Sequence, residues 1–216
     1  MSLVVVTGGS GGLGSAGAEN FRMAGYEVAA LSSSDLDVTD EISVREWFAD
    51  RAVDLLVCCA GATHDAPLAR LSSEKWRETW DVNYEGAVRC AEAALSGMRN
   101  RETGHIIFVS SFSALHPPGG QAAYAAAKAA LLGWMADHAT ALGNHNIRIN
   151  TILPGFMETR MTATVSASRR AEVLANHALG RLNTPAAAAA FIRFLHENLP
   201  HTSGQVFPLD SRPFRI

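Results

Sequence analysis

The sequence predicts an α/β fold in which one open, doubly wound sheet of parallel strands carries helices on both faces. Short apolar runs rich in Val, Ile and Leu alternate along the chain with longer segments of helical composition. The first apolar run enters a glycine-rich turn, which is typical of the first strand-to-helix connection in such sheets. The 216 residues show no internal repeat or linker, so we expect a single domain over residues 1–216.

Composition and charge exclude several classes of protein. Hydrophobic residues make up 48% and charged residues 18%, which is typical of a globular chain. The formal net charge of -3 argues against a nucleic-acid partner, and no apolar run reaches the length that spans a membrane. The three cysteines show no metal-ligand spacing, so we expect no metal site. No signal peptide is visible, and we expect a cytoplasmic protein.

The glycine-rich turn follows the apolar run Leu3–Val6, which we interpret as the first strand. The turn reads Thr7-Gly8-Gly9-Ser10-Gly11-Gly12-Leu13-Gly14. A helix over Ser15–Ala24 follows it, and Gly25 ends that helix. Glycines between a strand and a helix let backbone N–H groups approach a phosphate, and the helix N-terminus favours negative charge. The turn therefore predicts dinucleotide binding on a Rossmann-type sheet.

The segment after the second strand is unusually short. The strand, Tyr26–Leu31, runs into three serines and then reaches Asp37 after only five intervening residues. A parallel crossover with its helix needs at least about a dozen residues. We therefore expect the helix after the second strand to be missing, and any strand near Leu36 to be vestigial.

One further strand and two helices complete the first half of the pattern. A helix over Ile42–Ala49 precedes a strand over Val53–Cys59, which ends in the turn Ala60-Gly61. A long helix is then predicted from Ser72 or Ser73 to about Met98.

The central stretch brings three reactive side chains together. Ser111 follows the buried-looking strand Ile106–Val109, and Tyr124 and Lys128 stand four residues apart in an alanine-rich helix. Residues at that spacing share one helix face. Ligands of open α/β sheets lie outside the carboxyl ends of the strands, where Ser111 would lie. A hydroxyl, a phenol and an ammonium meeting there suit proton transfer to a carbonyl oxygen.

The last part of the chain adds two strands and one helix. The strand Ile147–Leu153 ends at Pro154-Gly155, and Phe156–Ala178 is interpreted as a mobile cover over the site. A helix from Thr184 to His196 and a final strand over Gly204–Leu209 follow.

Taken together, these residues resemble the short-chain dehydrogenase/reductase family over essentially the whole chain. The matching positions are the glycines of the first turn, Asp37-Val38, Ala60-Gly61, Asn83, Ser111, Tyr124, Lys128, Asn150 and Pro154-Gly155. Within the family, three segments are most similar to 3-oxoacyl-(acyl-carrier-protein) reductases. These segments are Gly119–Lys128, Pro154–Thr162 and Gly180–Leu182.

The resemblance implies a carbonyl reductase whose small-molecule substrate is reduced to an alcohol by hydride transfer. Its implied catalytic residues are Asn83, Ser111, Tyr124 and Lys128. Tyr124 would pass the proton, Ser111 would hold the substrate oxygen, Lys128 would bind the nicotinamide ribose, and Asn83 would hold a water. We also expect the Lys128 ammonium to lower the pKa of Tyr124. The implied cofactor contacts are Thr7, Gly8, Ser10, Gly12, Leu13, Gly14, Ser32, Ser33, Asp37, Val38, Ala60, Gly61, Tyr124, Lys128, Pro154, Gly155 and Thr159.

The cofactor preference depends on the tip of the second strand. NADP(H) is favoured, because Ser32–Ser34 supply hydroxyls and no acid that would repel a 2′-phosphate. NAD(H) is the alternative, because no Arg or Lys lies nearby and Asp35 could act as the acid if the loop folds back. The chain also departs from the family at Cys58-Cys59, where an Asn-Asn pair is expected.

Two interpretations remain besides the enzyme. The first is a nucleotide-binding regulatory protein that kept the fold and lost the redox chemistry, which would be expected to lack Tyr124 or Lys128. The second is a lyase-like relative without a cofactor, which would be expected to have bulkier residues in the glycine turn. We also expect a homodimer or homotetramer, because Ser73–Met98 and Gln121–Leu142 resemble the helices that pair subunits in this family.

Overall fold

The computed structural model describes residues 2–213 and contains a six-stranded sheet with the order β2-β1-β3-β4-β5-β6. All neighbouring strands are parallel. The strands are β1 (Leu3–Thr7), β2 (Glu27–Leu31), β3 (Val53–Cys58), β4 (Gly104–Val109), β5 (Ile147–Leu153) and β6 (Val206–Pro208). The strand order reverses between β1 and β3, so the crevice at their carboxyl ends is where such a sheet binds a ligand.

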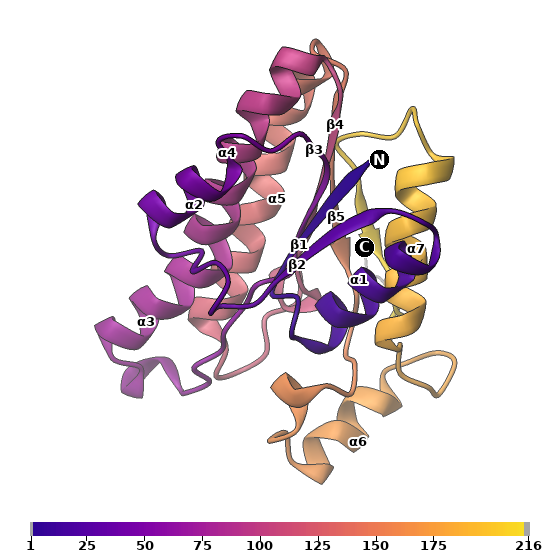
Figure 1. Cartoon of the computed structure of the whole chain (residues 1–216). Coiled ribbons are helices and arrows are strands. Elements are labelled where there is room, and N and C mark those ends of the chain that lie inside the picture. The colour runs from indigo at the N-terminus through magenta and orange to yellow at the C-terminus, as the bar shows by residue number, and fades with distance from the viewer. Residues whose placement is uncertain (1, 214–216) are drawn as a thin grey trace.

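Helices cover both faces of the sheet, which confirms the predicted doubly wound, Rossmann-type fold (Figure 1). One face carries α1 (Gly12–Met23) and α7 (Pro185–Asn198). The other face carries α2 (Glu41–Phe48), α4 (Gly86–Arg101) and α5 (Ala122–Gly143). Successive strand residues point to opposite faces and enter two separate cores. In β1, for example, Val5 packs on the α2, α4 and α5 side, and Val4 and Val6 pack on the α1 and α7 side.

The missing helix after β2 is confirmed. Residues 32–40 form turns without helix or strand, and α2 begins directly after them at Glu41. Leu36 and Val38 from this connection are buried in the core beside α2 and α4. The connection between β2 and α2 therefore contains no helix of its own, and Leu36 and Val38 hold it against the core.

The long helix predicted from Ser73 to Met98 is present, and it contains a π-helical turn that was not predicted. It consists of α3 (Ser73–Trp80), a π-helical turn over Asp81–Glu85 and α4. The side-chain amide of Asn83 donates to the carbonyl oxygen of Thr79 at 2.7 Å. A side chain that bonds the carbonyl four residues back competes with the backbone ladder there, and π turns mark such positions.

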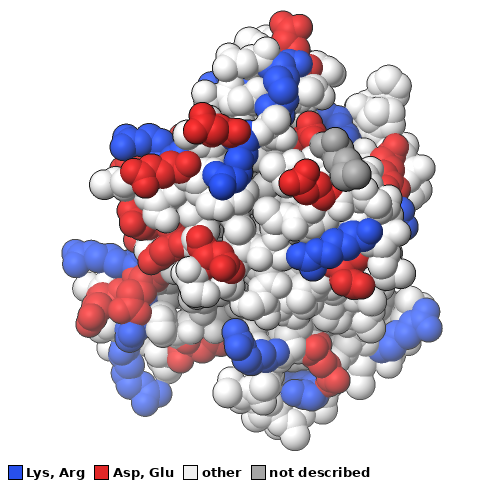
Figure 2. All heavy atoms as spheres, viewed as in Figure 1, with Lys and Arg blue, Asp and Glu red and all other residues white. Residues whose placement is uncertain are grey.

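The segment after β5 lies beyond the carboxyl ends of the strands. It contains a short 3-10 turn (Arg160–Thr162) and α6 (Ala167–Ala175), which Figure 1 shows below the sheet, near the start of α1. No helix among the described residues is both long and apolar enough to cross a membrane. On the face shown in Figure 2, acidic and basic side chains are interspersed.

Candidate active site

The glycine-rich turn is packed so closely that side chains would not fit. A Cβ on Gly8, whose φ is +66°, would lie 2.8 Å from the backbone of Ala60, and one on Gly14 would lie 2.3 Å from the carbonyl oxygen of Gly8. The Ala60 N–H donates to Thr7 Oγ1 at 3.3 Å, which joins this turn to the turn after β3. Helix α1 begins at Gly12 with no side-chain cap and no acidic residue in its first turn. An open, positive helix end of this kind fits a dinucleotide diphosphate.

The remaining predicted contacts on the glycine-rich turn differ in exposure. Ser10 is exposed and Leu13 is buried in the core beside α7. The side chain of Thr159 reaches the turn from the opposite side, since a Cβ on Gly12 would lie 2.6 Å from its methyl group. The segment after β5 therefore closes over the start of α1.

At the tip of β2, the loop folds back on itself. The carboxylate of Asp35 accepts from the Ser32 N–H at 2.9 Å and from the Ser32 hydroxyl at 2.6 Å. These hydrogen bonds lower the pKa of Asp35. An ionised carboxylate thus lies beside the serines, in the folded-back arrangement that the NAD(H) alternative requires. Ser33 is exposed beside it.

The Asp37-Val38 pair is divided between surface and core. Asp37 is exposed, and its carboxylate accepts from the backbone N–H and the hydroxyl of Thr39. Val38 is buried and its carbonyl oxygen accepts from Arg89 at 3.2 Å. The pair therefore holds the shortened connection in place beside the crevice.

The turn after β3 packs against the glycine-rich turn. Cys58 is buried in the core, and its thiol donates to the carbonyl oxygen of Ala87 at 3.7 Å. Burial raises the pKa of the Cys59 thiol to about 12, so this thiol stays protonated. Cys58 and Cys59 thus act as small packing residues where an amide pair was expected, and Ala60-Gly61 continue from them into the site.

Three of the four predicted catalytic residues come together as expected. Ser111 follows β4 and opens a 3-10 turn, with its hydroxyl accepting from the Ser113 N–H at 3.1 Å. Tyr124 and Lys128 lie on one face of α5, with the ammonium 5.8 Å from the centre of the Tyr124 ring. The Tyr124 phenol hydrogen-bonds Ser111. Ser111 at the carboxyl end of β4 and Tyr124 in the first turn of α5 are therefore joined by a hydrogen bond, and Lys128 lies close to the Tyr124 ring.

The ionisation of this group differs from the expectation. Burial raises the pKa of Tyr124; its hydrogen bond with Ser111 acts the other way, and the charge of Asp65 adds a smaller increase. The expected lowering by Lys128 is therefore wrong for this structure. Burial lowers the pKa of Lys128 to about 8, and its ammonium donates to the carbonyl oxygen of Val109 at 2.9 Å. An ammonium has two further hydrogens for other acceptors.

Asn83, the fourth predicted catalytic residue, is fully buried in the π-helical turn. Its amide nitrogen donates to the carbonyl oxygens of Thr79 and Ala62, each at 2.7 Å. Its Oδ1 has no hydrogen-bond partner among the described residues. A Cβ on Gly61 would lie 3.0 Å from this oxygen and 3.8 Å from the Lys128 ammonium. Oxygen and ammonium thus face the same space beside Gly61.

The turn after β5 is held by residues that the sequence analysis did not identify. Pro154 is buried, and its carbonyl oxygen accepts from the Asn183 amide at 2.8 Å. Gly155 has a φ of +81°, and a Cβ there would lie 2.6 Å from Asp210. Asp210 comes from the C-terminal segment, where isolated polar residues give no periodic signal, so only the folded chain reveals this contact. Asn150, by contrast, is buried within the sheet and bonds His105, Thr202 and Gln205.

The sheet is doubly wound, its glycine turn leads into an uncapped helix, and Ser111, Tyr124 and Lys128 lie at its carboxyl edge. This combination is typical of dinucleotide-dependent oxidoreductases. The family model described as Enoyl-(Acyl carrier protein) reductase matches residues 16–211 of the chain. The chain belongs to the short-chain dehydrogenase/reductase family, which confirms the predicted family and the prediction that it is an enzyme.

Relatives and a solved structure agree with this assignment. The chain is 33% identical to the 3-oxoacyl-(acyl-carrier-protein) reductase MabA of Mycobacterium tuberculosis (strain ATCC 25618 / H37Rv), over 96% of this chain and 90% of the relative. It is also 33% identical to the 3-oxoacyl-(acyl-carrier-protein) reductase FabG of Escherichia coli (strain K12), over 89% and 88%. A crystal structure of a short-chain dehydrogenase/reductase family oxidoreductase from Burkholderia thailandensis superposes with a TM-score of 0.89 at 28% identity, covering 97% of this chain and 91% of that one.

Proposed function

We propose that the protein is an NAD(P)(H)-dependent reductase that converts the carbonyl group of a 3-oxoacyl thioester to a hydroxyl. The observation that carries this proposal is the convergence of Ser111, Tyr124 and Lys128 near Gly61, in the turn that packs on the glycine turn. The thioester class is supported by the two 3-oxoacyl-(acyl-carrier-protein) reductases to which the chain is similar. The whole chain, residues 1–216, would act as one dinucleotide-binding domain.

The bound nicotinamide cofactor would supply the hydride. The Tyr124 phenol would donate its proton to the oxygen of the substrate carbonyl as the general acid. Ser111 would hold the same oxygen by a hydrogen bond. Lys128 would bind the nicotinamide ribose with the hydrogens that Val109 leaves free. Asn83 Oδ1 would hold a water that returns a proton to the site, because this buried acceptor needs a partner.

The cofactor contacts proposed from the sequence would form one path, from the tip of β2 across the glycine turn to the turn after β5. The fit is supported by the uncapped start of α1 and by the close packing of Gly8 and Gly14. NADP(H) was favoured because of the serines at the tip of β2, but the folded-back Asp35 opposes a 2′-phosphate, so the proposal retains both NADP(H) and NAD(H).

The experiment is a substrate panel assayed with NADPH and with NADH. Acetoacetyl thioesters should be reduced, and simple ketones should be poorer substrates. A crotonyl thioester belongs in the panel because the matching family model carries the name of an enoyl reductase. Turnover of the crotonyl thioester alone would replace the 3-oxoacyl assignment. Cofactor binding without turnover of any substrate would favour the regulatory protein instead.

We also propose that the protein is a homodimer or homotetramer in the cytoplasm. An open groove on the outer side of α3 is lined by Trp76, Trp80 and charged side chains of both signs. Trp76 and Trp80 suit a contact with a second copy of the chain, because aromatic residues are enriched at the core of protein interfaces. The three free cysteines suit a reducing compartment. Light scattering that finds a monomer at micromolar concentration would contradict the oligomer.

A further inference from the structure

Arg212 and Phe112 form a stacked pair that joins the segment after β6 to the turn that carries Ser111. The guanidinium Cζ of Arg212 lies 3.4 Å from the centre of the Phe112 ring. Atoms at this separation are in van der Waals contact, and the positive charge adds a cation–π attraction. Phe112 directly follows Ser111 and begins the 3-10 turn Phe112–Ala114. The stack therefore connects the residue next to Ser111 to a segment that follows a different strand of the sheet.

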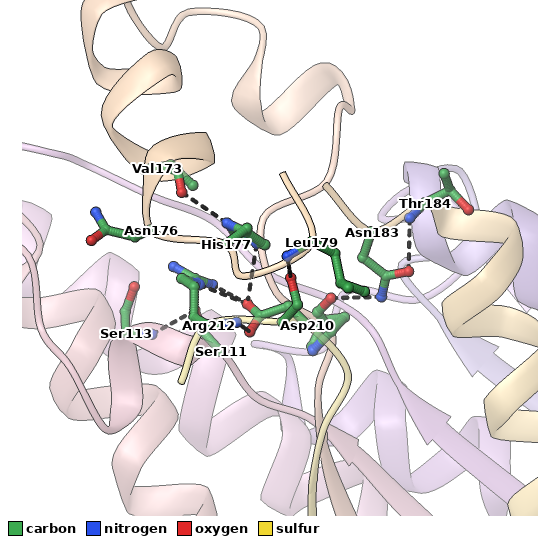
Figure 3. Close-up of polar contacts among 12 residues, drawn as sticks. Ser111, Ser113, Val173, Asn176, His177, Leu179, Asn183, Thr184, Asp210 and Arg212 are labelled. Carbon is green, nitrogen blue, oxygen red and sulfur yellow. Dashed lines mark hydrogen bonds and ion pairs between the residues drawn. The ribbon is translucent and has the colours of Figure 1, made fainter. Parts of the chain in front are cut away.

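Asp210 fixes the guanidinium of Arg212 (Figure 3). Its Oδ2 accepts from Arg212 Nε at 2.7 Å and from Arg212 Nη2, and its Oδ1 accepts from the backbone N–H of Arg212 at 3.1 Å. The side chain of Asp210 is 2% exposed and that of Arg212 13%, so these charged hydrogen bonds are weakened little by water. Asp210 also packs against the buried ring of His177, whose Nε2 lies 3.8 Å from Oδ2. The planar guanidinium is thus held in the orientation in which it stacks.

Asp210 is itself fixed to the turn after β5. Strand β6 pairs with β5 up to Leu153 and Pro208, and the Leu209 N–H donates to the carbonyl oxygen of Leu153 at 2.9 Å. Asp210 comes directly after this pairing and packs on Gly155, where a Cβ would lie 2.6 Å from its Oδ2. Gly155 is one of the predicted cofactor contacts. The position of Arg212 therefore follows that of the turn that would lie beside the nicotinamide.

The orientation of Ser111 depends on the turn that Phe112 begins. The Ser111 hydroxyl accepts from the Ser113 N–H at 3.1 Å, and the Ala114 N–H donates to the carbonyl oxygen of Ser111 at 3.0 Å. The Ser113 hydroxyl donates to the side-chain oxygen of Gln121 at 3.0 Å, which joins the later part of the turn to the start of α5. The first residue of the turn, Phe112, is held by Arg212. Movement of the Phe112 ring would therefore shift the backbone at Ser111.

We propose that Arg212 is a positioning residue that, through its stack on Phe112, fixes the Ser111 hydroxyl relative to the turn after β5. This inference rests on the proposed function, because it assigns the fixed distance to the reaction of that site. The cofactor would lie beside one turn, and the substrate oxygen would be held by the other. A small misplacement of reacting groups lowers the rate much more than it lowers binding. Loss of Arg212 therefore lowers kcat and leaves KM nearly unchanged.

The first part of the test measures hydrogen exchange on the full chain. Arg212→Met keeps an apolar side chain of similar reach and removes the guanidinium. The amides of Ser113 and Ala114 should then exchange about tenfold faster, because the turn opens more easily without the stack. The matched control is Arg169→Met, which removes an exposed arginine of α6 that pairs with Glu172, and its exchange should match the wild type.

The second part measures turnover of an acetoacetyl thioester. In Arg212→Met, kcat should fall about tenfold, with KM within about twofold of the wild type, and Arg169→Met should change neither. Arg212→Lys keeps the charge but lacks the plane that stacks, so it should resemble Arg212→Met. Phe112→Leu removes the other half of the stack and should give the same two changes, which decides the proposal even if Arg212→Met does not fold.

A double-mutant cycle separates positioning of Ser111 from a general effect on the fold. Ser111→Ala removes the hydroxyl that Arg212 is proposed to position. Adding Arg212→Met to this variant should lower kcat by less than about twofold, because little of the effect of Arg212 is then left. A further tenfold loss in the double variant would overturn the route through Ser111.

The remaining outcomes are equally decisive. Equal exchange in the wild type and the stack variants would overturn the stack as the support of the turn. Faster exchange with unchanged kcat would overturn its role in the reaction. Wild-type kcat in Arg212→Lys would show that charge alone suffices and would overturn the stacked geometry. If no substrate is turned over by the wild type, the proposed function fails, and the exchange of Ser113 and Ala114 still decides whether Arg212 holds the turn.

Discussion

The Lys128 ammonium lies 5.8 Å from the centre of the Tyr124 ring, and its hydrogen bond goes to the carbonyl oxygen of Val109. Lys128 therefore does not bond the phenol in this structure, and the pKa of Tyr124 is raised by burial. The upward shift makes the phenol a weaker acid, which is opposite to the lowering that we expected from Lys128.

The first prediction concerns Tyr124→Phe. This variant should lose at least about 100-fold in kcat while it still binds cofactor, because general acid catalysis contributes on that scale. Cofactor binding is measured by fluorescence titration and turnover by absorbance of the reduced nicotinamide. Tyr26→Phe, which alters a phenol near His196 on the far side of the fold, should keep wild-type activity. Activity of Tyr124→Phe within a few-fold of the wild type would contradict the role of the phenol.

The second prediction is that the buried charge of Lys128 destabilises the folded protein, so that its removal increases stability. Burial lowers its pKa from 10.5 to about 8, so at neutral pH the folded protein holds a buried charge. The shift corresponds to on the order of 3 kcal/mol. Lys128→Met removes that charge and the bond to Val109, which is worth about 1–2 kcal/mol. We expect Lys128→Met to be inactive and more stable than the wild type by about 1 kcal/mol at pH 7.

The second prediction also specifies how the free energy of unfolding changes with pH. Because the folded pKa is depressed, the unfolded chain binds more protons between about pH 8 and 10.5. Wild-type stability should therefore contain a rising contribution over that window, and Lys128→Met should lack it. Urea unfolding at several pH values measures the difference. The control is Lys75→Met, which removes a surface lysine paired with Glu78. An advantage of Lys128→Met that grows with pH would contradict the assignment.

The third prediction concerns two stacked histidines at the amino end of the sheet, of which His105 is buried and His196 is partly buried. His105 and His196 stack with their Nδ1 atoms 3.3 Å apart, and burial lowers the pKa of His196 to about 4. The unfolded histidine takes up a proton near pH 6.5, so stability falls as pH drops from 6.5 to about 4. The loss from His196 alone should be on the order of 3 kcal/mol.

Urea unfolding at several pH values between about 4 and 7 checks this loss. His196→Gln should flatten the curve, because an amide does not titrate. His145→Gln, at an exposed position, should keep the wild-type slope. A curve for His196→Gln as steep as that of the wild type would assign the acid sensitivity to other groups.

Much of the fold could be predicted because it depends on local patterns. Apolar runs indicated the strands, and the residue count between Leu31 and Asp37 correctly excluded a helix. The spacing of Tyr124 and Lys128 correctly placed both on one face of α5. These features need only the period of a helix or strand and the length of a crossover.

Other features depend on contacts between distant segments. The π-helical turn at Asn83 arises because its amide bonds the carbonyl oxygens of Thr79 and Ala62 at once. The contact between His177 and Asp210 joins residues 33 positions apart, in two segments without hydrophobic periodicity. The pKa of Tyr124 depends on burial, which local sequence does not give. Such properties follow from tertiary packing and were therefore not predicted.

The last prediction concerns Asp35 and the choice between the two cofactors. The Asp35 carboxylate is bound to the backbone N–H and the hydroxyl of Ser32, at the tip of β2. A carboxylate at this tip accepts from a ribose 2′-hydroxyl and repels a 2′-phosphate. Its lowered pKa keeps it ionised at neutral pH. Asp35→Asn should therefore raise kcat/KM for NADPH relative to NADH by about tenfold, since one unfavourable charge contact is removed. The ratio is measured with one thioester substrate, and Asp50→Asn, at an exposed position after α2, is the matched control. An unchanged ratio in Asp35→Asn would show that the 2′ position lies away from this loop, and the three serines would then decide the preference.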